Sequence, residues 1–271
     1  MNASELNATI FRKLKQAEIA DARLEARLLT AHVVGIDPTK LSPVSTVAVS
    51  SDMVAAAESL MQRRITGEPL QYLLGIWEFM GLPFYVEEGV LIPRADTEIL
   101  CESALRLISE RGYQTVLDLC CGSGCIGITL AKLSDVSVVL ADISTECLAM
   151  SQKNAELNQV AVSTIHTDLF SALKDQKFDL ICCNPPYLTA TDMENLQTEV
   201  RHEPSLALYG GVDGLAFYRR IAAEYRSVLN PQGALLLEIG SSQAESVGAM
   251  FGTETVWKDY AGHPRVVYAE N

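Results

Sequence analysis

Apolar residues repeat at one spacing in the first part of this chain and at other spacings after it. This change of spacing divides the chain into segments. From residue 4 to about residue 73, apolar positions such as Leu6 and Ile10 repeat at the spacing of amphipathic helices. Caps are expected at Ser4 and Asp21. This first segment therefore predicts a small helical domain.

Two prolines interrupt the helical pattern, and a β-hairpin is expected after it. Pro38 and Pro43 break the pattern before a third helix, which should open at Ser51 and end near Gly67. Between residues 77 and 90, two short runs of strand-forming residues flank a glycine, which predicts a hairpin.

Beyond the hairpin the pattern becomes that of alternating helices and strands. A helix capped by Asp96 or Thr97 is expected from Glu98 to Arg111. Short apolar runs then alternate with helical periods, which predicts a parallel-rich sheet covered on both faces, with an antiparallel edge at its end. The expected strands are 115–119, 137–140, 162–166, 178–183, 234–239, 253–257 and 265–269, and the expected helices are 123–132, 145–157, 215–229 and 243–251.

Composition narrows the class of protein. The chain has 271 residues and a net charge of −13, from 21 basic and 34 acidic side chains. This sign opposes binding to a phosphate backbone, so a protein or small-molecule partner is favoured over nucleic acid. No apolar run approaches the roughly 18 residues of a membrane span, and the start lacks the features of a secretory signal. We expect a cytoplasmic protein that is not bound to membranes.

The cysteines predict no metal site. There are seven of them, an odd number, and they form no Cys-x-x-Cys pair. Most lie in apolar runs, as small core residues of a cytosolic protein do. A zinc site built from Cys120, Cys121 and Cys125 lacks histidines at a ligand-like spacing.

Polar chemistry is expected where the strand at residues 178–183 ends. Asn184 follows that strand, and Pro185 and Pro186 have no N–H for a strand ladder and stiffen the backbone. Asn184 would thus stand beyond a carboxyl end, where open α/β sheets place ligands. Its side chain offers one carbonyl acceptor and two N–H donors, and Tyr187 adds an aromatic face.

A glycine-rich loop predicts a second part of the same site. Residues 118–127 contain Gly-x-Gly-x-x-Gly between an expected strand and an expected helix, beginning at Gly122. Asp142 follows that glycine by 20 residues and ends the next strand. These are the spacings of a nucleotide-binding fold, in which the acidic residue takes ribose hydroxyls.

Two cofactors are compatible with this loop. A dinucleotide would bring pyrophosphate close to the Asp118 carboxylate, which is unfavourable. S-adenosylmethionine carries a sulfonium and an ammonium group instead, and a carboxylate suits both. Asp168 follows the third strand and could receive the adenine amino group, with Leu169 and Phe170 as apolar cover. The charges favour S-adenosylmethionine.

The loop with Asp118 and Asp142, together with Asn184-Pro-Pro-Tyr187, resembles class I methyltransferases that modify planar exocyclic or amide nitrogens. Three further stretches, 89–98, 201–208 and Asp213-Gly-Leu, are similar to the family that methylates the glutamine of the Gly-Gly-Gln motif in class 1 peptide-chain release factors. The similarity extends from the N-terminal helices through Arg265. The family loop usually has small Gly or Thr residues where this chain has Cys120 and Cys121.

This resemblance implies a fold, a reaction and an organisation. The fold is a Rossmann-like doubly wound sheet, mostly parallel with an antiparallel edge strand, and the reaction turns S-adenosylmethionine into S-adenosylhomocysteine. We expect a helical substrate-recognition domain at 1–74, a hairpin linker at 75–92 and a catalytic domain at 93–271. The protein would act as a monomer on class 1 release factors, with no nucleic-acid partner.

The expected site residues follow from the same motifs. Catalysis would be by positioning, with Asn184 Oδ1 and the Pro185 carbonyl accepting the N–H bonds of the substrate amide, and Pro186 and Tyr187 packing against it. Arg94, between a proline and a helix start, is a candidate for the substrate surface. The expected cofactor residues are Asp118, Cys120, Cys121, Gly122, Ser123, Gly124, Asp142, Asp168, Leu169 and Asn184.

Three alternatives remain at this point. Asn-Pro-Pro-Tyr also suits an adenine amino group, so a nucleic-acid adenine methyltransferase is possible, although the acidic charge opposes it. An NAD-dependent oxidoreductase would use the same glycine loop. A degenerate fold that serves as a scaffold would bind no cofactor.

Overall fold

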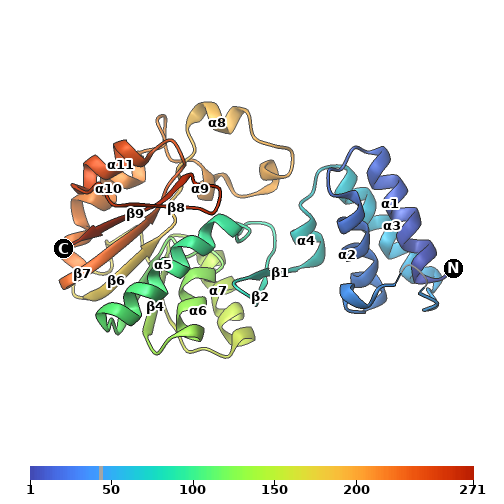
Figure 1. Ribbon diagram of the computed structural model, residues 1–271, viewed down its shortest axis with the longest axis horizontal. Coiled ribbons are helices and arrows are strands. Elements are labelled where there is room, and N and C mark those ends of the chain that lie inside the picture. The colour runs from blue at the N-terminus through green and yellow to red at the C-terminus, as the bar shows by residue number, and fades with distance from the viewer. Residues whose placement is uncertain (43–44) are drawn as a thin grey trace. The chain divides into compact units, whose positions relative to one another are not determined.

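The computed structural model describes residues 1–42 and 45–271, and its larger sheet has seven strands (Figure 1). The strand order is β5-β4-β3-β6-β7-β9-β8. The strands are β3 (Thr115–Leu119), β4 (Ser137–Asp142), β5 (Ser163–His166), β6 (Phe178–Cys183), β7 (Leu229–Glu238), β8 (Val256–Lys258) and β9 (Pro264–Glu270).

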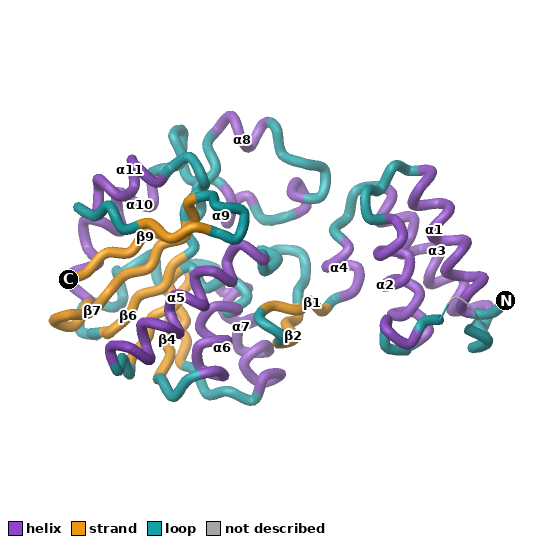
Figure 2. The backbone as a smooth tube through the Cα atoms, in the orientation of Figure 1, coloured by secondary structure: helices purple, strands orange, loops and turns teal. Residues whose placement is uncertain are grey.

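Helices cover both faces of this sheet, as the alternation of apolar strands and helices predicted (Figure 2). On one face lie α5 (Ala95–Arg111), α6 (Cys125–Leu133) and α7 (Thr145–Asn158). On the other lie α10 (Ala216–Glu224), the 3-10 turn η3 (Tyr225–Val228) and α11 (Ala244–Phe251). Side chains of each strand alternate between the two cores, so the sheet is doubly wound.

The sheet is parallel from β5 through β7, and its one reversed strand is β9. Strand β9 pairs antiparallel with both β7 and β8. The reversed strand that we expected at the edge therefore lies one position inside it, and β8 forms the edge. Chain order reverses between β3 and β6, which is where such sheets bind ligands.

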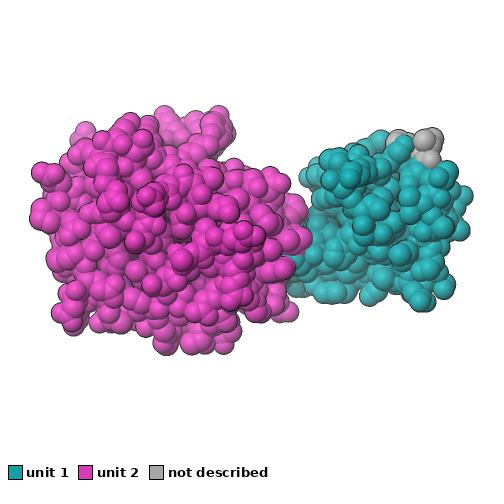
Figure 3. Space-filling model, turned by 90° about the horizontal axis from the view of Figure 1, so that it is seen from below, with its two compact units in different colours: residues 1–75, 198–202 teal, residues 76–197, 203–271 magenta. Residues whose placement is uncertain are grey.

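The chain divides into two compact units, residues 1–75 with 198–202 and residues 76–197 with 203–271 (Figure 3). The first contains α1 (Ala3–Gln16), α2 (Ala22–Val34), η1 (Pro38–Lys40), α3 (Ser51–Ile65), α4 (Leu70–Leu74) and η2 (Val200–His202). The predicted break at Pro43 lies outside the described residues.

A buried ion pair holds the distant segment 198–202 within the first unit. The Arg64 guanidinium, only 5% exposed, donates to Glu25 at 2.7 Å and to Glu199 at 2.9 Å. Removing one partner of such a pair leaves a charge without compensation in the interior, which is strongly destabilising. Arg64 therefore links the buried Glu25 to Glu199, whose side chain is 40% exposed and lies 135 residues further along the chain than Arg64.

The hairpin consists of β1 (Ile76–Phe79) and β2 (Leu82–Tyr85), and it belongs to the second unit. Met80 and Gly81 both have positive φ, as a two-residue hairpin turn requires. The Tyr85 N–H donates to Asn154 on α7 at 2.6 Å. The hairpin thus packs on the sheet domain, and the division into three parts remains a prediction.

Several predicted boundaries of helices and strands were wrong, because the residue at which a helix begins depends on backbone geometry as well as on residue type. Helix α1 is capped by Asn2, which exchanges two 2.9 Å hydrogen bonds with Glu5, and not by Ser4. Helix α5 begins after Arg94, without a side-chain cap. Strand β7 begins at Leu229 and not at residue 234, and its register with β6 shifts within the added residues. Three short helices were missed, α4, α8 (Ala190–Glu194) and α9 (Ser205–Leu208).

Candidate functional site

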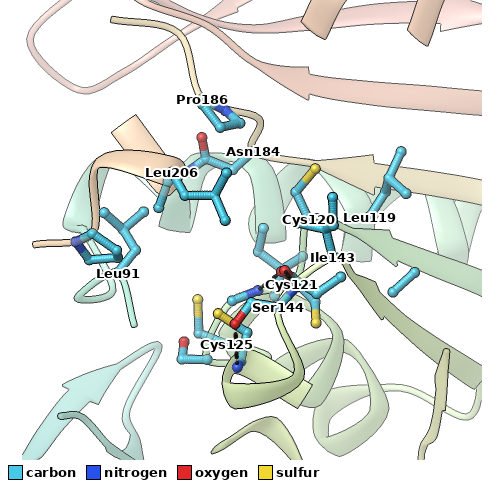
Figure 4. Close-up of a pocket in the computed structure, with 18 of the residues that line it drawn as sticks. Leu91, Leu119, Cys120, Cys121, Cys125, Ile143, Ser144, Asn184, Pro186 and Leu206 are labelled. Atoms are coloured by element: carbon cyan, nitrogen blue, oxygen red, sulfur yellow. Dashed lines mark hydrogen bonds between the residues drawn. The ribbon is translucent and has the colours of Figure 1, made fainter. Parts of the chain in front are cut away.

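A cavity of about 340 Å³ opens at the carboxyl ends of β3, β4 and β6 (Figure 4). This volume is within the range of small-molecule sites. The residues predicted from the sequence that line it are Arg94, Cys120, Cys121, Gly122, Ser123, Asp142, Asp168, Leu169, Asn184 and Pro186. The predicted residues that do not line it are Asp118, Gly124, Phe170, Pro185 and Tyr187.

The glycine loop is held against the end of β4 by the Asp142 carboxylate. Its Oδ2 accepts the Gly122 N–H at 2.8 Å, and its Oδ1 accepts the Ser144 N–H at 2.9 Å. Burial raises the pKa of Asp142 more than these hydrogen bonds lower it. Each oxygen keeps a lone pair. Asp142 can therefore order the loop and still accept hydroxyl groups of a ligand.

The glycines of this loop have different functions. Gly122 has φ +53 and lines the cavity, and a Cβ there would meet no atom within 4 Å. The space over its backbone is thus open to a ligand. At Gly127, a Cβ would lie 2.4 Å from Leu140 and 2.9 Å from Val138, so this glycine lets α6 pack closely on β4.

Asp118 does not face the cavity, which corrects its predicted contact with a sulfonium or ammonium group. Its neighbours Leu117 and Leu119 point to one core, so its carboxylate points to the other, beneath α6. There Oδ2 accepts the Gly127 N–H at 2.8 Å, and Oδ1 is buried without a hydrogen-bond partner among the described residues. Asp118 supports the start of α6 from behind.

The segment after β5 supplies the side wall of the cavity. Asp168 forms a 2.8 Å ion pair with Arg220, and both side chains line the cavity and are about half exposed. Leu169 is buried and has φ +49. Thr167 ties this segment together, since its hydroxyl donates to the Leu169 carbonyl at 3.0 Å. A flat apolar group of a ligand could therefore pack against Leu169, with the Asp168 carboxylate beside it.

Asn184 and Pro186 lie across the cavity from Cys121 and Ser144 (Figure 4). The Asn184 Nδ2 donates to the Thr97 hydroxyl at 3.3 Å. Because the nitrogen is engaged, the carbonyl Oδ1 is the end of the amide that remains to accept hydrogen bonds from a ligand.

Pro185 and Tyr187 are not among the residues that line the cavity, and their contacts with a substrate stay a prediction. Tyr187 is held by its backbone, since Gln243 Nε2 donates to its carbonyl at 3.1 Å. Burial raises the pKa of Tyr187 to about 12. A Cβ at Gly210 would lie 2.7 Å from the Pro186 carbonyl. The segment is therefore fixed by close backbone contact.

The mouth of the cavity joins two segments that the sequence analysis singled out. The Glu203 carboxylate is buried, accepts the Ile92 N–H at 3.1 Å and pairs with Arg94. Arg94 lines the cavity, as does Leu206, which is 57% exposed. A charged and an apolar side chain thus flank the opening, where a protein segment could enter.

Four thiols line the cavity, namely those of Cys120, Cys121, Cys125 and Cys147. Burial raises the pKa of Cys125 to about 12 and that of Cys147 to about 11. The thiols of Cys125 and Cys147 are therefore protonated and polarisable, and not nucleophilic. Within residues 1–42 and 45–271, no group of three or more His, Cys, Asp or Glu side chains is arranged to hold a metal ion.

Sequence reasoning missed several residues of the wall, some of them next to predicted site residues and others in separate segments. Their signal was weak, since hydroxyls and single apolar residues occur everywhere. They are Thr97, Cys125, Ile143, Ser144, Cys147, Thr167, Leu206, Phe217 and Arg220.

Two family models match the chain. One describes the PrmC N-terminal domain and matches residues 5–75, and the other describes the methyltransferase small domain and matches residues 97–203.

Curated relatives match over most of their length. A release factor glutamine methyltransferase of Geobacter sulfurreducens is 44% identical, over 88% of this chain and 84% of the relative. One of Clostridium botulinum is 36% identical, over 94% of each chain.

Solved structures share the fold at low identity. The 16S rRNA N2 G1207 methyltransferase of T. thermophilus, in complex with AdoMet and guanosine, has a TM-score of 0.53 at 22% identity, over 72% of this chain and 49% of that one. A methyltransferase of Pyrococcus furiosus has a TM-score of 0.52 at 15% identity, over 82% and 98%.

Proposed function

The chain belongs to the release factor glutamine methyltransferase family, and we propose that it transfers a methyl group from S-adenosylmethionine to N5 of the glutamine in the Gly-Gly-Gln motif of class 1 release factors. The observation that carries this proposal is the Asn184 amide, which stands across the cavity from the glycine loop with its nitrogen bound to Thr97.

The cofactor cavity fits S-adenosylmethionine by the chemistry of its walls. Asp142 would accept the ribose hydroxyls, and the open backbone of Gly122 would let the cofactor approach the loop. Leu169 would cover the adenine, beside the Asp168 carboxylate. The bound cofactor supplies the methyl group, already activated as a sulfonium. Asp118, which accepts the Gly127 N–H beneath α6, would support the loop and not contact that charge.

The chain's own residues would act on the substrate by positioning. An amide nitrogen is a poor nucleophile because its lone pair is delocalised into the carbonyl. Asn184 Oδ1 and the Pro185 backbone carbonyl would accept its two N–H bonds and stabilise the positive charge that develops on nitrogen. Pro186, which lines the cavity, would pack against the flat amide. Held in line with the methyl donor, the nitrogen needs no nucleophilic side chain.

The substrate would enter between Arg94 and Leu206, and the helical unit would grip the release factor elsewhere. The net charge of −13 favours a partner with basic patches over nucleic acid. No helix in the described parts of the chain is long and apolar enough to cross a membrane. We place the reaction in the cytoplasm and propose a monomeric enzyme.

Mass spectrometry tests the function directly. The purified protein is incubated with a class 1 release factor and S-adenosylmethionine, and the Gly-Gly-Gln peptide is analysed. One added methyl on its glutamine is expected, and a release factor whose glutamine is replaced by alanine should gain none. Methylation of offered DNA or RNA, with the release factor unchanged, would contradict the proposal.

A further inference from the structure

Strand register places Glu238 beside Asn184. Strands β6 and β7 are parallel, and Cys183 pairs with Leu237, so the next residues of each strand, Asn184 and Glu238, are level at the carboxyl edge of the sheet. Cys183 and Leu237 point to the core under α10 and α11. Because side chains alternate, Asn184 and Glu238 point to the opposite face, where α5 begins.

On that face Asn184, Glu238 and Thr97 form a group of three neighbouring polar side chains. The Asn184 Nδ2 donates to Thr97 Oγ1 at 3.3 Å. Thr97 and Asn184 also lie close enough to the Glu238 carboxylate to lower its pKa, as donors to a carboxylate do. Because the Asn184 nitrogen donates to Thr97, the nitrogen is the end of the amide that faces this pair of side chains.

We propose that Glu238 and Thr97 are positioning residues that fix the Asn184 amide, with its nitrogen held by the protein and its carbonyl presented to the substrate amide. The inference rests on the proposed role of Asn184 as an acceptor of substrate N–H groups. Without this network the amide can rotate by half a turn and present a donor, which a substrate amide N–H cannot use.

Burial makes Glu238 unusual for a residue with only a packing function. It is 1% exposed, and its Oε2 has no hydrogen-bond partner among the described residues. Burial raises its pKa to about 7, although Thr97, Arg265 and Asn184 all lower it. Carboxylates that are buried at a cost in free energy are concentrated at functional sites. The Tyr218 hydroxyl, which donates to the Glu238 carbonyl at 2.9 Å, fixes this end of β7.

Paired variants separate positioning from packing. Thr97→Val keeps the shape of the side chain and removes the hydroxyl, whereas Thr97→Ser keeps the hydroxyl. Glu238→Gln keeps the volume and places a donor toward the network. Thr129→Val is the matched control, because Thr129 is also a fully buried helical threonine but does not line the cavity, and its hydroxyl has no partner among the described residues.

Kinetics give the first readout. Thr97→Val and Glu238→Gln should lower kcat for release factor methylation about ten-fold or more, with the KM for the release factor and the Kd for S-adenosylmethionine within about three-fold of wild type. Thr97→Ser should restore most of kcat, and Thr129→Val should keep it. Wild-type kcat in both Thr97→Val and Glu238→Gln would overturn the inference, as would loss of cofactor binding in parallel with kcat.

A spectroscopic readout needs no turnover. In NMR spectra of protein labelled with ¹⁵N-asparagine, the side-chain resonances of Asn184 are identified as those that disappear in the Asn184→Ala variant. They should shift in Thr97→Val and Glu238→Gln but stay in place in Thr97→Ser and Thr129→Val. Unshifted resonances would refute the positioning role. A wild-type protein that leaves the release factor unmethylated would contradict the proposed function instead, while the resonances would still test the network.

Discussion

The Gly127 N–H donates to Asp118 Oδ2 at 2.8 Å, beneath the start of α6 and away from the cofactor cavity. Desolvation raises the pKa of this fully buried carboxyl to about 7, more than the Gly127 hydrogen bond lowers it. A folded-state pKa above the unfolded one means that the folded protein binds more protons. The stabilisation from this group is therefore complete below about pH 4 and is lost as the pH rises through about 7.

Asp118→Asn should remove this pH dependence while keeping an acceptor for Gly127. The variant's free energy of unfolding, relative to wild type, should increase by about 4 kcal/mol at most between pH 4 and pH 8. Urea unfolding at several pH values measures it.

Asp179→Asn provides the control with the opposite sign. Burial opposes ionisation of Asp179, but hydrogen bonds from Gln114, Asn230 and Thr115 outweigh it and lower its pKa. Its stabilisation is therefore present above its unfolded pKa and lost in acid. A difference between Asp118→Asn and wild type that is constant with pH would contradict the burial of a titrating Asp118.

Cys120→Gly should stabilise the protein. Cys120 has φ +59, a conformation in which a residue with a Cβ is strained by about 1 kcal/mol and glycine is not. We expect the free energy of unfolding to rise by up to about 1 kcal/mol, offset in part by the greater chain entropy of glycine. Cys121→Gly is the matched control. Cys121 is buried with ordinary φ, so its replacement should destabilise, and the opposite ranking would count against the loop geometry.

Arg94→Ala should weaken binding of the protein substrate and spare the cofactor. Arg94 lies at the cavity mouth, paired with the buried Glu203. We expect the KM for the release factor to rise about ten-fold, with little change in the Kd for S-adenosylmethionine measured calorimetrically. Arg111→Ala, which removes an exposed arginine paired with Glu270, should leave both values unchanged. Equal KM values for the two variants would reject a substrate role for Arg94.

The sequence was sufficient to predict the strands that carry the site. Strands β3 and β6 begin and end at the predicted residues, because buried parallel strands are continuous apolar runs bounded by polar or proline residues. The positions of Asp142 and Asn184 at strand ends followed directly. Their place in the cavity wall needed only the rule that carboxyl ends of parallel strands meet at one edge.

What the sequence could not give is the face of the sheet to which each side chain points. Asp118 occupies a strand end as predicted, yet its side chain points to α6. When both faces of a strand are apolar, the sequence does not indicate which side chains point to which face, so this direction could not be predicted. Thr97 and Glu238 reach Asn184 from separate segments, so no local motif indicates them. Helix starts depend on backbone geometry, as Gly124 before α6 illustrates with φ +79.

The most direct test of the account is single-turnover methyl transfer by Asn184→Ala, measured together with its affinity for S-adenosylmethionine. If the Asn184 carbonyl stabilises the charge that develops on the substrate nitrogen, the rate should fall about 100-fold or more, while the cofactor Kd changes by less than about three-fold. A variant that transfers the methyl group at the wild-type rate would contradict the account.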